Sequence, residues 1–87
     1  MNYGVVLSDE AAKVLLRTDA KLRARLQNRL HQLAENPFDP RLSAPLTDRP
    51  GVRKSRVGDW RILFTVDRQA RRVQVATIDT RGQAYRK

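Results

Sequence analysis

Lysine and arginine side chains recur at alternate positions in the C-terminal half of the chain. Lys54 and Arg56 are two residues apart, and Arg61 follows after a Gly-Asp pair typical of a hairpin turn. If these segments are strands, alternate side chains share a face, and the three cations gather on one side of a sheet. Arg81 and Tyr85 follow the last apolar segment and would complete a basic patch suited to phosphate groups. Ordinary polar alternation on a solvated sheet face is the competing interpretation.

The net charge favours a polyanionic partner. The 87 residues include 18 Lys and Arg against 9 Asp and Glu, a net charge of +9. Residues 51–87 hold 10 basic and 3 acidic side chains, whereas residues 1–50 hold 8 and 6. The excess therefore predicts a nucleic acid or another acidic partner on the C-terminal half.

Other features of the composition exclude whole classes of site. Cysteine is absent, which excludes disulfides and thiolate chemistry, and the single histidine excludes a His-His metal site. We expect no metal and no cofactor. No apolar run is long enough to span a membrane, and no secretion signal is evident, so we expect a cytoplasmic protein.

The N-terminal half predicts one strand followed by two helices. The apolar run Tyr3–Leu7 carries two β-branched residues, which is typical of a strand. Ser8 is a candidate N-cap, and the acidic residues after it favour a first helix of about nine residues. Thr18 or Asp19 caps a second, longer helix that ends at Asn36, because a residue before proline avoids the α region. Its leucines recur at helical spacing: Leu22, Leu26, Leu30 and Leu33.

The C-terminal half predicts three strands after a connector. Residues 37–50 carry all four prolines, which is typical of an extended connector. The expected strands are Val52–Val57, Trp60–Asp67 and Arg72–Asp79. Alternation predicts an apolar face formed by Trp60, Ile62, Phe64 and Val66. In the last strand it places Val73 and Val75 on one face and Ala76 and Ile78 on the other. The order β-α-α-β-β-β predicts an α+β fold, with two N-terminal helices packed on one face of an antiparallel sheet.

Three segments of the chain resemble segments of the RelE/ParE toxin superfamily, and they come in the same order along the sequence. Arg56–Phe64 reads RVGDWRILF and is similar to the family's RVGDYR-apolar-apolar-aromatic core. Ile78–Tyr85 reads IDTRGQAY and resembles its closing I-G-x-R-x-x-x-Y segment, and Glu35-Asn36-Pro37 fits its L-x-x-NP helix ending. The resemblance covers residues 1–87 as a single toxin domain.

This resemblance implies a cytoplasmic bacterial toxin of a type II toxin–antitoxin pair. In the RelE branch such a toxin is a ribosome-dependent, metal-independent endoribonuclease, which cuts mRNA in the ribosomal A site and inhibits translation. The implied partners are an acidic antitoxin, mRNA and ribosomal RNA, and the toxin–antitoxin complex would bind its own operator DNA. The positions that match the family's catalytic residues are Lys54, Arg56, Arg61, Arg81 and Tyr85.

The resemblance also suggests how these groups would divide the work of cleavage by a ribose 2′-hydroxyl. Either Lys54 or Tyr85 would be the general base, with Arg61 clamping the phosphate and Arg81 assisting the leaving group. Arg56 stands where better-known members carry lysine, and since arginine does not accept protons its role would be electrostatic. Asp79-Thr80 stands where the family commonly has Gly-His.

Two other interpretations of the sequence compete with this one. A ParE-type member would share the fold but inhibit DNA gyrase, and a third possibility is an inactive RNA-binding relative. Trp60 is expected in the core rather than as a base-stacking platform, and His31 is expected to be solvated. A further set of cations would contact ribosomal RNA or form a plain solvated face: Lys21, Arg23, Arg25, Arg29 and Arg53.

Overall fold

The fold is given by a computed structural model, which describes residues 2–80. The elements in chain order are β1 (Gly4–Leu7), α1 (Asp9–Arg17), α2 (Ala20–Glu35), β2 (Ala44–Pro45), β3 (Arg53–Val57), β4 (Trp60–Asp67) and β5 (Arg72–Thr80). The predicted helices and four longer strands are confirmed to within a residue or so at each end. The two-residue β2 lies in the connector and is an addition to the predicted order.

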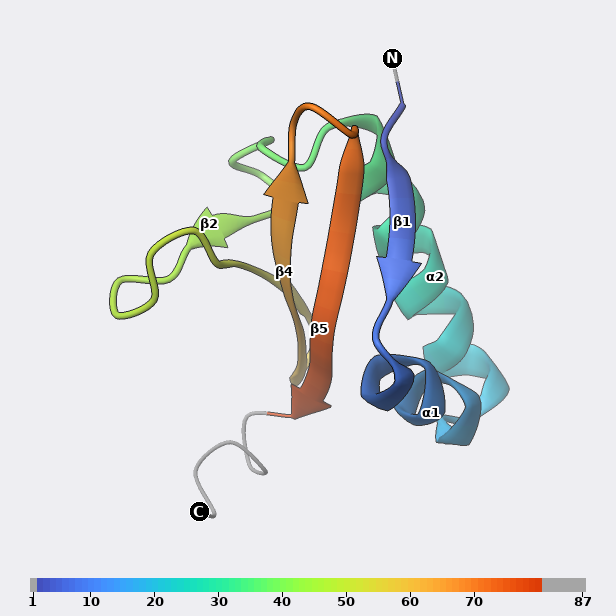
Figure 1. Ribbon diagram of the computed structural model, residues 1–87. Helices are drawn as coiled ribbons and strands as arrows, with labels where there is room; N and C mark the ends of the chain where they lie inside the picture. The colour runs from blue at the N-terminus through green and yellow to red at the C-terminus, as the bar shows by residue number, and fades with distance from the viewer. Residues whose placement is uncertain (1, 81–87) are drawn as a thin grey trace.

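The sheet has five strands in the order β1-β5-β4-β3-β2, and both helices lie on one side of it (Figure 1). The β2–β3, β3–β4 and β4–β5 pairs are antiparallel, as expected. β1 instead pairs with β5 in parallel, with Gly4 opposite Arg72, so the expectation of a purely antiparallel sheet is wrong at this edge. The connection between these parallel strands contains both helices and strands β2, β3 and β4, and parallel neighbours require such a long connection. The α+β class is confirmed.

Side-chain caps explain where the helices begin. The Ser8 hydroxyl accepts a hydrogen bond from the Ala11 amide (3.0 Å) and donates to the Ala76 carbonyl on β5 (2.7 Å). The Asp19 carboxylate accepts from the Leu22 amide (2.8 Å), so Asp19 is the N-cap of α2. The buried Thr18 hydroxyl instead donates to the Leu15 carbonyl (2.8 Å) and closes α1. Of the two predicted caps for α2, the structure selects the aspartate.

A bulge in β5 changes the face of its last residues. Phe64 lies opposite Val75 but Leu63 lies opposite Thr77, so Ala76 is the extra residue. Beyond it Ile78 points to the same side as Val75 and is 1% exposed. The expectation that Ile78 faces away from Val75 is therefore wrong, because simple alternation contains no bulge.

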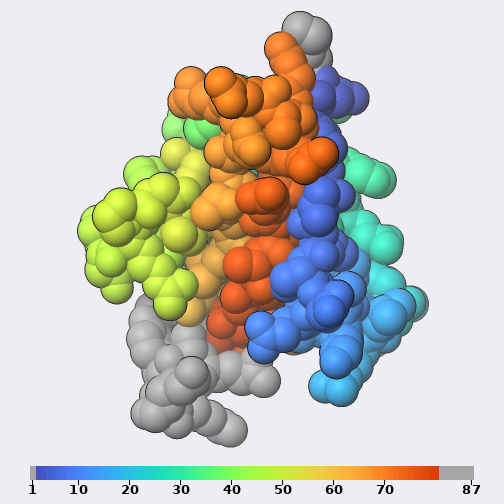
Figure 2. Space-filling view, in the orientation of Figure 1, coloured from blue at the N-terminus to red at the C-terminus, as the bar shows by residue number. Residues whose placement is uncertain are grey.

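The core lies between the helices and this face of the sheet. Phe64 and Ile62 are fully buried there, and Trp60 is half-buried against them, which confirms the predicted apolar face of β4. The leucines of α2 pack onto the same cluster. The opposite face of the sheet carries no helix and is turned to the viewer in Figure 2. Within residues 2–80, neither helix has the length and apolarity needed to cross a membrane.

Candidate active site

The β3–β4 hairpin brings two of the predicted cations side by side. Its turn contains Gly58, whose positive φ of 61° is readily adopted only without a side chain. The register places Arg56 directly opposite Arg61. Residues paired across antiparallel strands share a face, so both side chains lie on the open side of the sheet.

Lys54 lies on the same open face, one cross-strand row away. It is opposite Leu63, which in turn is opposite Thr77 on β5. Leu63 is only 5% exposed, so the side chain beside Lys54 in its row is apolar and buried. A hollow of about 230 Å³ borders Lys54 and Arg56, and its other lining side chains include Arg29. The structure thus gathers three predicted cations on one surface.

Asp79 completes the row of Arg56 and Arg61, a position that the sequence pattern did not predict. The Arg61 Nε donates to Asp79 Oδ1 at 2.9 Å. The two side chains are 27% and 21% exposed, so the pair is largely shielded. A strand drawn without the bulge would place Arg61 opposite Ile78, which is why the pairing is hidden in the sequence. In residues 2–80 the Nη atoms of Arg61 have no hydrogen bond, and they remain available to a ligand.

Two of the cations expected to contact ribosomal RNA are engaged inside the protein. Arg23 donates through Nε and Nη2 to three carbonyls at the end of α1, at 3.1, 3.2 and 2.7 Å. Arg29 donates through Nη1 to the Ser55 hydroxyl (2.9 Å) and the Arg56 carbonyl (2.7 Å), and so ties α2 to β3. Both guanidinium groups satisfy backbone acceptors that need partners, and a structural role accounts for their positions.

The remaining members of that set lie in different places. Lys21 and Arg25 are exposed on α2 and border a hollow of about 390 Å³ that Trp60 also lines. Arg53 donates to the Ser43 hydroxyl (3.0 Å) and lies over the Phe38 ring, at 5.2 Å from its centroid. Only Lys21 and Arg25 of the five are therefore both exposed and without a hydrogen-bond partner in the described part of the chain.

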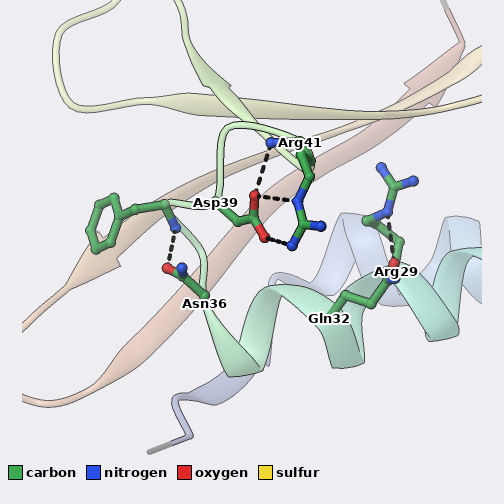
Figure 3. A network of polar contacts seen from close by, with 6 residues as sticks. Arg29, Gln32, Asn36, Asp39 and Arg41 are labelled. Carbon is green, nitrogen blue, oxygen red and sulfur yellow. Dashed lines mark hydrogen bonds and ion pairs between the residues drawn. The ribbon is translucent and has the colours of Figure 1, made fainter.

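The second ion pair of the described residues lies in the connector after α2. Asp39 accepts from the Arg41 backbone amide (2.9 Å) and from its guanidinium (2.8 Å), as Figure 3 shows beside the Arg29–Gln32 contact. The Arg41 side-chain hydrogen bond, followed by that of its backbone amide, lowers the pKa of Asp39 below its ordinary value. The same contact raises the pKa of Arg41. This pair shapes the loop after α2 and involves none of the open-face cations.

Arg81 and Tyr85, the two other predicted catalytic residues, lie outside the described residues. Within residues 2–80, no three acidic or histidine side chains lie close enough together to ligate one metal ion. His31 is exposed on α2, as expected. In the part of the chain that the structure describes, the row of Arg56 and Arg61 thus offers a ligand two guanidinium groups beside the Asp79 carboxylate.

Comparison with known proteins settles the family. Residues 5–85 match the family model for the ParE toxin of the type II toxin–antitoxin system parDE. The chain belongs to the RelE/ParE toxin family. It is also 33% identical over 86 residues to the toxin RelE of Mycobacterium tuberculosis, covering 97% of this chain and 87% of that relative. The protein is a RelE-like toxin of a type II toxin–antitoxin system.

Solved structures share the fold of this toxin. The RelBE2 toxin–antitoxin complex of M. tuberculosis contains a chain that matches with a TM-score of 0.79 at 24% identity, covering 93% of this chain and 100% of that one. The isolated RelE toxin of Escherichia coli matches with a TM-score of 0.78 at 19% identity, covering 90% and 83%. The five-stranded sheet with helices on one face is therefore the architecture of RelE structures.

Proposed function

We propose that this toxin is a metal-independent endoribonuclease that cleaves mRNA in the ribosomal A site by attack of a ribose 2′-hydroxyl. The observation that carries the proposal is the grouping of Lys54, Arg56 and Arg61 on the open sheet face, where Asp79 is their only acidic neighbour in the register rows. Similarity to a toxin RelE, at 33% identity, supports the same branch of the family.

Arg61 is suited to hold the scissile phosphate. Asp79 occupies only its Nε, so the two Nη groups can face a phosphate through parallel N–H bonds. A guanidinium already fixed by a carboxylate loses little rotamer entropy when it binds, and it is in place as charge develops on the phosphorane. Loss of such a donor costs about 3 kcal/mol, or roughly a hundredfold in rate.

We assign the proton transfers to other groups. The 2′-hydroxyl must lose a proton, and Lys54 or Tyr85 is the proposed base. Arg56 supplies positive charge opposite Arg61 without exchanging protons, because its guanidinium stays protonated. Arg81 is proposed to stabilise the departing 5′-oxygen. The nucleophile belongs to the substrate, so no covalent enzyme intermediate is required.

The proposed partner in the resting state is an acidic antitoxin. The solved relatives include a toxin–antitoxin complex, and this chain has a net charge of +9 with exposed cations on its open face. Long-range attraction would then speed association, and a segment that folds on binding would cover Arg61 and Arg81. We expect the association rate to fall markedly between about 50 and 500 mM salt.

Toeprinting in a reconstituted translation system tests the enzymatic proposal. The parent toxin should cut mRNA at the A-site codon, and Arg61→Ala should cut it at least a hundredfold more slowly while circular dichroism shows a folded chain. Lys13→Ala on α1, which removes one exposed charge far from the open face, should cut like the parent. Intact mRNA together with inhibited DNA supercoiling by gyrase would overturn the proposal and favour a ParE-type target.

A further inference from the structure

The turn between β4 and β5 carries three exposed arginines that the proposed chemistry does not use. Arg68, Arg71 and Arg72 are exposed, and the turn that joins β4 to β5 lies at the end of the sheet opposite to the β3–β4 hairpin (Figure 1). Arg61 and Asp67 lie six positions apart on the extended β4 strand, a length of about 20 Å. Asp67 is the one acid of residues 67–72, and its Oδ1 accepts from the Ala70 amide (3.1 Å).

Aromatic rings orient two of these guanidinium groups without consuming their hydrogen-bond donors. Arg68 lies over the Phe38 ring at 4.4 Å from its centroid, and Arg71 lies 6.0 Å from the Tyr3 centroid. Stacking of this kind leaves the N–H edge of guanidinium free for a phosphate. None of the three forms an ion pair or hydrogen bond through its side chain within residues 2–80. They differ in this from Arg23 and Arg29, whose donors are taken by the protein.

The backbone at Arg71 gives an independent reason to ask why arginine stands there. Its φ is +55°, and it is the one non-glycine residue of the described chain with positive φ. Glycine or asparagine would adopt that conformation with less strain. An arginine here keeps a cation at the end of the turn, directly before β5, at the expense of local backbone energy, which indicates that the charge itself has a use.

A nucleic-acid backbone fits this surface better than a protein partner. Protein interfaces need a buried apolar centre, and the two large hydrophobic side chains exposed in residues 2–80, Val6 and Leu16, lie on β1 and α1. The turn offers planar cationic groups stacked on aromatics, which is the chemistry that binds phosphodiesters.

We propose that Arg68, Arg71 and Arg72 form a second RNA-binding site, which holds phosphate groups remote from the cleaved bond. The identity of the polymer rests on the proposed function, whereas the phosphate chemistry rests on the turn itself. Two sources present this chemistry: the mRNA strand continuing along the open face, and ribosomal RNA at the wall of the A site. The site anchors the toxin and takes no part in the chemical step.

Binding measurements with uncleavable RNA test this site. A 2′-O-methyl oligonucleotide lacks the attacking hydroxyl, so binding is measured apart from cleavage. The variant Arg68→Gln/Arg71→Asn should bind this RNA or 70S ribosomes about tenfold more weakly than the parent, with the log–log salt slope reduced by about 1.4 for two lost phosphate contacts. Asparagine is chosen because it tolerates the positive φ of residue 71.

The control Lys13→Gln/Arg17→Gln removes the same charge from α1, where both side chains are exposed. If the turn variant binds the oligonucleotide more weakly but binds ribosomes like the parent, the site holds the mRNA strand. If it binds ribosomes more weakly but binds the oligonucleotide like the parent, the site holds ribosomal RNA. Equal binding by the turn and control variants overturns the inference, as does a loss confined to antitoxin binding. A parent toxin that binds RNA through the turn but cuts none refutes the enzymatic proposal and leaves the second site standing.

Discussion

Replacement of Arg29 by alanine separates a structural cation from an RNA-binding one. Its Nη1 group donates to the Ser55 hydroxyl and to the Arg56 carbonyl, and it is the side chain that joins α2 to β3 by hydrogen bonds. Ser55 is 1% exposed but also donates to the Leu42 carbonyl at 2.6 Å, so the substitution leaves no buried hydroxyl without a partner.

The expected cost follows from these contacts. Hydrogen bonds from a charged donor each contribute about 1.5–3 kcal/mol. The hydrogen bond to the Arg56 carbonyl lies at the surface, and the Ser55 hydroxyl keeps its hydrogen bond to the Leu42 carbonyl. We therefore expect a loss of about 2–3 kcal/mol in the free energy of unfolding. A domain of this length has roughly 4–13 kcal/mol in total. Arg29→Ala should therefore remain folded at room temperature but lose a substantial part of its margin.

Urea unfolding followed by circular dichroism measures the effect. With an m value of about 1 kcal/mol/M, the midpoint should fall by about 2 M. Lys21→Ala is the matched control, because it removes the same charge from the same helix at an exposed position, and its midpoint should stay within about 0.5 M. If both variants unfold at the parent's midpoint while Arg29→Ala binds RNA poorly, the structural assignment of Arg29 is refuted and the RNA contact expected from the sequence is correct.

Three further outcomes are expected. Phe64→Ala removes a fully buried ring and should cost about 3–5 kcal/mol, read from thermal unfolding; a loss below about 1 kcal/mol would contradict the packing. Arg41→Ala should raise the pKa of Asp39 toward 3.8, measured by NMR titration of the carboxyl. Because that pKa is lowered in the fold, the pair stabilises the parent above pH 3.8 and loses this contribution as pH falls, a dependence the variant should lack. Asp79→Asn frees the Arg61 side chain and should slow RNA cleavage severalfold with stability kept within about 1 kcal/mol; unchanged cleavage would show that the 2.9 Å contact does not orient Arg61.

Local signals predict most of the fold. Ser8 and Asp19 mark helix starts because their side chains can reach amides three residues ahead, and the structure shows these bonds. The alternation along β4 predicts its buried face because no bulge interrupts that strand. The same alternation also predicts that Lys54 and Arg61 share a surface.

Features that depend on distant segments are not encoded in such patterns. The parallel pairing of β1 with β5 joins residues at the two ends of the described chain. Because no turn connects the two strands directly, no turn motif in the sequence predicts their pairing. The extra residue Ala76 shifts the register, and with it the partner of Arg61. Charge alone also does not distinguish the arginines that cap backbone carbonyls from those that remain free, since this depends on the packing of α2 against α1 and β3.

The pairing of the first strand with the last has a consequence for how the protein is made. Val5 finds its neighbour in Val73, and Ser8 bonds to Ala76, 68 residues later. Contacts of such sequence separation slow folding and cannot form on a partly synthesised chain. A translation product that stops before β5 lacks the strand that pairs with β1 and packs against α1, and it cannot assemble the open-face row that Asp79 completes. The activity of this toxin thus begins only after β5 has been synthesised.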